Sequence, residues 1–114
     1  MVIRVGGFFI TNIKIGEVIA SRSLTIKNAD GKTSEFVVLI GKPCLTEGSS
    51  NFYAPYQFRG IGKENVKYAA GVDTVQAIQL AMVMIGAELD AINSKTGNNI
   101  RWECRDESGD FGFP

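Results

Sequence analysis

The 114-residue sequence contains no histidine, two cysteines and three prolines, and its formal net charge is zero. Without histidine the chain lacks the commonest general base, the commonest metal ligand and every Ser–His or Cys–His nucleophile pair. Zero net charge argues against general nucleic-acid binding, which needs a basic excess to neutralise phosphates. We therefore expect no catalytic residue set, no metal and no cofactor.

The two cysteines, Cys44 and Cys104, are far apart and belong to no C-x-x-C motif, so zinc and thioredoxin-type patterns are absent. A disulfide between them would close a loop of about 60 residues. The favoured interpretation is two buried or partly buried thiols in a reducing cytoplasm. The sequence also shows no signal peptide and no run of 18 apolar residues, so we expect a cytoplasmic, soluble protein without a membrane partner.

Length and composition predict one domain spanning residues 1–114, since 45% of the residues are hydrophobic and one core suffices at this size. Residues 2–13 are compatible with a strand kinked at Gly6 and Gly7. Residues 18–27 alternate apolar and polar side chains, and residues 33–42 are rich in β-branched residues. The turn formers at residues 28–31 join these two strands into an antiparallel hairpin.

An aromatic segment follows at residues 52–60, with Phe52, Tyr53, Tyr56 and Phe58 within seven positions. Pro55 cannot donate to a strand ladder, so this segment is predicted as an edge or bulged strand. Alternation directs about half of the aromatic side chains into the core, and the others remain candidates for a binding surface. Residues 66–72 form a short strand or an irregular lead into a helix, and residues 100–105 alternate as a final strand.

The strongest prediction is a helix over about residues 73–92. Asp73 is a good N-cap, and Gln76 completes a variant of the capping box. Apolar residues then recur at helical spacing, namely Val75, Ile78, Met82, Ile85, Leu89 and Ile92. Leu80, Val83 and Met84 widen this surface, which predicts that most of the helix circumference is covered. Gly86 in mid-helix indicates a close backbone approach to a strand or to a partner chain.

Strands followed by a helix with short connections predict an α+β fold. We expect an antiparallel sheet of about four to five strands with the one long helix packed on one face.

Charge is distributed unevenly along the chain. Residues 1–72 carry nine Lys or Arg and five Asp or Glu, whereas residues 73–114 carry three and seven. Such a dipolar chain can steer a charged partner. The acidic cluster consists of Glu103, Asp106, Glu107 and Asp110. Three interpretations stay open for it: a solvated surface, a docking surface for a basic partner, and, least favoured, a carboxylate catalyst.

Six stretches of the sequence resemble a family of small bacterial proteins known only as a domain of unknown function. They are PYQF (55–58), GIG (60–62), YAAGVD (68–73), QAIQLA (76–81), MIGAEL (84–89) and DFGFP (110–114). The resemblance implies a compact bacterial α+β domain and provides no catalytic residues. In size and composition the chain also resembles the immunity partners of bacterial toxins.

Two functions from different classes follow. The first is a non-catalytic module, of immunity or inhibitor type, that occludes a basic toxin domain through Glu103, Asp106, Glu107, Asp110, Tyr53 and Tyr56. The second is a small ligand-binding domain or histidine-free enzyme with a pocket between helix and sheet near Tyr53, Tyr56 and Tyr68. A homo-oligomer with Gly86 at the self-contact is a third possibility, and nucleic acid is not an expected partner.

Overall fold

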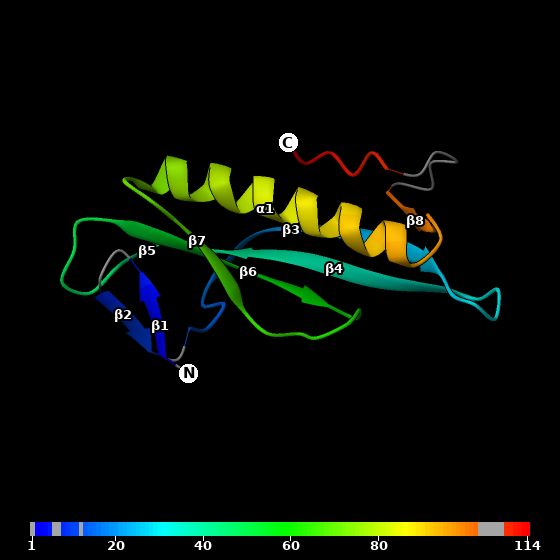
Figure 1. Ribbon diagram of the computed structural model, residues 1–114, viewed down its shortest axis with the longest axis horizontal. Helices are drawn as coiled ribbons and strands as arrows, with labels where there is room; N and C mark the ends of the chain where they lie inside the picture. The colour runs from blue at the N-terminus through cyan, green and yellow to red at the C-terminus, as the bar shows by residue number, and fades with distance from the viewer. Residues whose placement is uncertain (1, 6–7, 12, 103–108) are drawn as a thin grey trace.

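The computed structural model describes residues 2–5, 8–11, 13–102 and 109–114, with side chains described from residue 13 onward. Eight strands and one helix follow one another along these residues (Figure 1). Their bounds are β1 Val2–Val5, β2 Phe8–Thr11, β3 Val18–Lys27, β4 Thr33–Gly41, β5 Cys44–Leu45, β6 Phe52–Arg59, β7 Lys67–Gly71, α1 Thr74–Lys95 and β8 Ile100–Arg101.

The main sheet is antiparallel, has six strands and places α1 across one face (Figure 1). Its order is β5-β6-β4-β3-β8, and β7 pairs with β6 on the opposite edge from β4. The β3–β4 hairpin turns at residues 28–31, where the Gly31 amide donates to the Asn28 carbonyl. The predicted α+β fold is therefore confirmed, with six strands in the sheet where four or five were expected.

Pro55 does not make β6 an edge strand, contrary to the sequence-based prediction. β6 lies inside the sheet, with β7 on one side and β4 and β5 on the other. β4 pairs with residues 56–59 of β6 and β5 pairs with residues 52–53, so neither strand pairs with Pro55. The proline occupies the gap between β4 and β5, where its missing N–H breaks no ladder on that side.

The N-terminal segment differs from the single kinked strand expected over residues 2–13. β1 and β2 pair with each other in an antiparallel two-stranded sheet, with Val2 opposite Thr11 and Val5 opposite Phe8. This hairpin is separate from the six-stranded sheet. At the other end of the chain, only residues 100–101 of the predicted strand 100–105 are observed in β8, and residues 103–105 lie outside the described residues.

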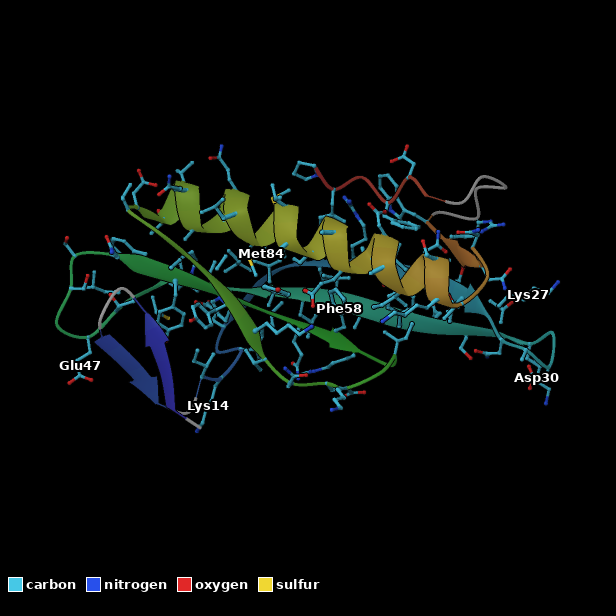
Figure 2. The ribbon with its side chains drawn as sticks, viewed as in Figure 1. Lys14, Lys27, Asp30, Glu47, Phe58 and Met84 are labelled. Atoms are coloured by element: carbon cyan, nitrogen blue, oxygen red, sulfur yellow. The ribbon has the colours of Figure 1, made fainter. Side chains whose placement is uncertain are left out.

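The core lies between α1 and the sheet. Alternate residues of β3, β4 and β6 point towards the helix, and Figure 2 shows Phe58 beneath α1. The sheet contributes buried Leu24, Ile26, Phe36, Val38, Ile40, Ala54, Tyr56 and Phe58 to this core, and the helix contributes Ala77, Ala81, Ile85 and Leu89. A smaller cluster around Ile13 includes Tyr53 and Tyr68. The aromatic run of β6 is therefore divided between two packing environments, as strand alternation requires.

The start of α1 matches its sequence signal. The Asp73 carboxylate accepts a hydrogen bond from the Gln76 amide at 2.7 Å, which satisfies one of the free N–H groups of the first turn. The Gln76 side chain reaches back to the amide of Val72 at 2.8 Å, one residue earlier than in the usual capping box. The helix extends to Lys95, three residues beyond the predicted end.

The helix is not covered over most of its circumference, contrary to expectation. Its buried line is formed by small residues such as Ala77 and Ala81 together with Ile85 and Leu89, so the helix backbone approaches the sheet closely. Val75, expected in the buried stripe, is 62% exposed. Outside that line, Ile78, Met82 and Ile92 pack against the core, whereas Leu80, Val83 and Met84 are each at least 41% exposed.

Candidate functional site

The outer face of α1 carries an apolar ridge, which we define as Leu80, Val83, Met84 and Ala87. The three larger side chains are each 41–47% exposed, and Ala87 is exposed between the turns. No charged residue occurs from position 74 to position 87. A solvent-facing helix surface ordinarily carries charged or polar residues. The ridge is therefore one exposed apolar feature of the described surface that the fold itself does not explain; others include Leu45, Val72 and Val75.

A groove runs along the ridge on the side of β7, where Figure 2 places Met84. Its volume is about 540 Å³, and one wall consists of Met84, Ala87 and Glu88 of the helix. Residues 65–68 form the other wall, and Tyr56 also lines the groove. The groove is mostly apolar and ends in a small polar cluster.

This polar cluster consists of Tyr56, Lys67 and Glu88. The Tyr56 hydroxyl donates to Glu88 Oε2 at 2.7 Å, and the Lys67 ammonium pairs with Glu88 Oε1. Burial, followed by the hydrogen bond to Glu88 and the negative charge of that carboxylate, raises the pKa of Tyr56 well above its ordinary value. The phenol is therefore held in its neutral, donating form, and both oxygens of Glu88 are engaged. The arrangement is suited to fixing the groove wall rather than to abstracting a proton.

A second groove follows the ridge on its other side, where residues 109–114 lie beside α1 (Figure 1). Its volume is about 270 Å³, and Val83 and Phe113 provide its apolar wall. Asp90 from the helix and Asp110 from the C-terminal segment both line it. The C-terminal groove is thus apolar in its wall and acidic at its rim.

The C-terminal segment is held in place by Arg22 of β3. Arg22 Nη1 donates to the Phe111 carbonyl at 2.7 Å, and its guanidinium lies 4.2 Å from the centre of the Trp102 ring and 4.8 Å from that of Phe113. Phe111 itself is buried in the core. Gly86 allows the segment to approach, because a Cβ there would lie 2.9 Å from the Pro114 carbonyl oxygen. The chain's own C-terminal segment therefore accounts for the mid-helix glycine.

Of the predicted site residues that the structure describes, Tyr56 and Tyr68 line the same groove, whereas Tyr53 and Asp110 do not line it. Tyr56 is buried in the core and also lines the groove along β7. Tyr53 is half-buried and packs edge-to-face on Tyr68 at 6.4 Å between ring centres, in the smaller cluster. Asp110 is exposed on the C-terminal groove. Glu103, Asp106 and Glu107 lie outside the described residues.

A family comparison covers most of the chain. A family model described as a domain of unknown function, DUF6968, matches residues 20–114. The chain belongs to the DUF6968 family. No curated protein and no solved structure matches it. The matched region of this DUF6968 chain includes α1, the C-terminal segment and the β3–β4 hairpin apart from the first two residues of β3, whereas the β1–β2 hairpin precedes it.

Two further properties of the DUF6968 chain bear on its chemistry. Within the described residues, no three carboxylate or cysteine side chains come together as a candidate metal site. Cys44 is a free and exposed thiol, not the buried or half-buried one expected, because it lies on the two-residue edge strand β5. Cys104 lies outside the described residues.

By length and composition alone, α1 could span a membrane. One such helix is weak evidence, because the core helix of a soluble protein meets the same criterion. Here α1 packs on β6 and β7 through its alanine-rich side.

Proposed function

We propose that this DUF6968 chain is a cytoplasmic, non-catalytic protein-binding module of bacterial immunity or inhibitor type, which occludes the active site or substrate surface of a toxin. The observation that carries the proposal is the apolar ridge on α1, flanked by a groove on each side. The centres of protein interfaces are depleted of charge and enriched in large apolar residues such as methionine. The ridge has this composition, and the two grooves can receive side chains of the partner.

Charge at the rim favours a basic partner. Asp90 and Asp110 line the C-terminal groove beside Val83. Carboxylates at an interface rim accelerate the capture of a positively charged protein and make its binding salt-dependent. An enzyme that acts on nucleic acid presents the positive surface that phosphate binding requires. A basic toxin nuclease therefore fits both the apolar ridge and its acidic rim.

The groove along β7 supports a second candidate function, a small ligand-binding domain. Its volume of about 540 Å³ lies within the range of small-molecule sites, and its polar end at Lys67 and Glu88 could orient a ligand. The two functions differ in the surface they use. A bound small molecule would contact the polar cluster and leave Val83, on the other side of the ridge, unaffected.

The test is a calorimetric titration of the chain with the catalytic domain of the toxin-like protein encoded beside its gene. We expect binding that weakens at high salt, and at least a tenfold weaker Kd for Val83→Glu, because a carboxylate would be buried at the interface centre. Ala29→Glu is the matched control, since it adds the same charge in the exposed β3–β4 turn. Absence of binding, or equal Kd values for the two variants, would contradict the proposal.

A further inference from the structure

A pocket distinct from the two ridge grooves lies between α1 and the β3 side of the sheet. Its volume is about 160 Å³, and its lining is almost entirely apolar. Ala20, Val38 and Ile40 of the sheet form one side, and Ile78 and Met82 of the helix form the other. Val38 and Ile40 are buried, whereas Ala20 is exposed, so the pocket extends from the molecular surface into the core.

The pocket exists because β3 carries a small residue near its start. Alternate residues of a strand point to the same face, so Ala20 points to the same side as Leu24 and Ile26, which belong to the core beneath the helix. Those two large side chains fill their space, whereas Ala20 supplies only a methyl group. The pairing of β3 with β4 is also irregular between Val18 and Ala20, as in a β-bulge, and the pocket reaches Ile19 at this irregularity.

The packing of α1 elsewhere keeps the pocket open. The helix packs on β6 and β7, and its closely packed side includes the small residues Ala77 and Ala81. A shift of the helix towards β3 would open that contact. Because native interiors contain few voids larger than a water molecule, a preformed apolar pocket of this size is typical of a site that a ligand fills.

The size and lining of the pocket define the ligand that it accepts. A dry apolar cavity of about 150 Å³ binds benzene, so a volume of about 160 Å³ accommodates one aromatic ring. Arg22 is the charged residue of the lining, and its guanidinium donates to the Phe111 carbonyl and lies against the Phe113 ring. Burying a charged or polar group against the apolar walls would be costly. The ligand that fits is therefore uncharged and apolar.

From these observations we propose that this pocket binds a small uncharged apolar molecule with a body of about one aromatic ring. The molecule contacts Ile40 of the sheet, Ile78 and Met82 of the helix, and Phe113 of the C-terminal segment. Because a ligand that binds only the folded chain stabilises it, occupancy also raises the thermal unfolding midpoint. The pocket shares no lining residue with the groove along β7 and does not rest on the proposed function.

The experiment is an NMR titration of the folded chain with toluene, followed through the methyl groups of the protein. Toluene is the probe because it is uncharged and has a single ring. We expect saturable shift changes at the methyl groups of Ala20, Ile40, Ile78 and Met82, together with a higher thermal unfolding midpoint at saturation. The same titration is made on three variants, each first checked for cooperative thermal unfolding.

The variants change the free volume of the pocket or of the ridge grooves. Ala20→Leu fills the pocket and should weaken toluene binding at least tenfold. Ala20→Val fills less of it and should have an intermediate effect, which keeps the test valid if the larger side chain disturbs folding. Ala87→Leu is the matched control, because it makes the same substitution in the two grooves beside the ridge, and it should leave the Kd within twofold.

Three results would overturn the proposal. The first is the absence of saturable toluene binding. The second is a Kd that Ala87→Leu raises as much as Ala20→Leu does, because toluene would then occupy a ridge groove. The third is a dimer of the chain that Ala20→Leu abolishes in sedimentation equilibrium, because a second copy would then fill the pocket.

Discussion

Gly86→Ala tests whether the C-terminal segment is part of the folded domain. In a helix interior, alanine is favoured over glycine by about 1 kcal/mol. Here, however, a Cβ would lie 2.9 Å from the Pro114 carbonyl oxygen and 3.2 Å from Phe113 Cβ. Both neighbours would have to move, and the movement would remove part of the burial of the Phe113 ring. Full burial of a phenylalanine side chain stabilises by about 1.5–3 kcal/mol, so the half-buried Phe113 contributes about 0.8–1.5 kcal/mol, and displacing its ring costs at most that amount.

The gain in helix propensity and the loss of Phe113 burial oppose each other, so the change in the free energy of unfolding depends on whether residues 113 and 114 are present. In the full chain, we expect Gly86→Ala to change the free energy of unfolding by less than about 0.5 kcal/mol, because the gain in helix propensity and the cost of displacing Phe113 nearly cancel. In a chain that ends at Gly112, the same substitution should raise it by about 1 kcal/mol, because the clash is gone and the helix propensity remains. The assay is urea denaturation followed by circular dichroism. Equal stabilisation in both backgrounds would refute the close packing of this segment on α1.

Two further substitutions probe the polar contacts of the helix. Asn93→Ala should lower the free energy of unfolding by about 1–3 kcal/mol in urea denaturation, because the Asn93 side chain accepts a hydrogen bond from the buried Ile100 amide at 3.0 Å and the variant leaves that amide unsatisfied. The control, Ser94→Ala at the exposed neighbouring position, should change the free energy of unfolding by less than about 0.5 kcal/mol. Equal effects of the two substitutions would contradict this role of Asn93. Tyr56→Phe should cost about 1 kcal/mol at neutral pH. Because the pKa of Tyr56 is raised in the folded state, its contribution is complete below the unfolded tyrosine pKa of about 10 and is lost as pH rises above it. In that range, the free energy of unfolding of the Tyr56→Phe variant should therefore fall less steeply with pH than that of the parent chain, and the two slopes should differ by about 1.4 kcal/mol per pH unit. Parallel curves would contradict this role of Tyr56.

The sequence predicted the elements whose signals are local. Asp73 identified the helix start, because an N-cap is decided by a few neighbouring residues. The turn at residues 28–31 likewise identified the β3–β4 hairpin. The prediction that Pro55 places its strand at an edge was wrong. A proline can lie inside the sheet here because neither β4 nor β5 pairs with it, and that depends on how the strands pair and not on the β6 sequence.

The candidate site was harder to predict from sequence. The helical periodicity identified the apolar residues of α1 but not the side that the sheet covers. The prediction placed the bulky Val83 and Met84 in the interior. They are exposed, because the side of the helix that packs closely on the sheet includes the small residues Ala77 and Ala81. The available signal was the absence of charge from residue 74 to residue 87, which exceeds what one buried face requires. That Asp90 and Asp110 line the same groove could not be predicted, since it depends on where the C-terminal segment lies.

In the proposed function, the ridge on α1 is the surface that a protein partner covers. Methyl NMR spectra of the chain, recorded during titration with the toxin domain, test it most directly. We expect the largest shift changes at the methyl groups of Leu80, Val83 and Met84, with little change at Ala29 in the β3–β4 turn. Changes that are absent from these three residues while binding occurs would contradict it.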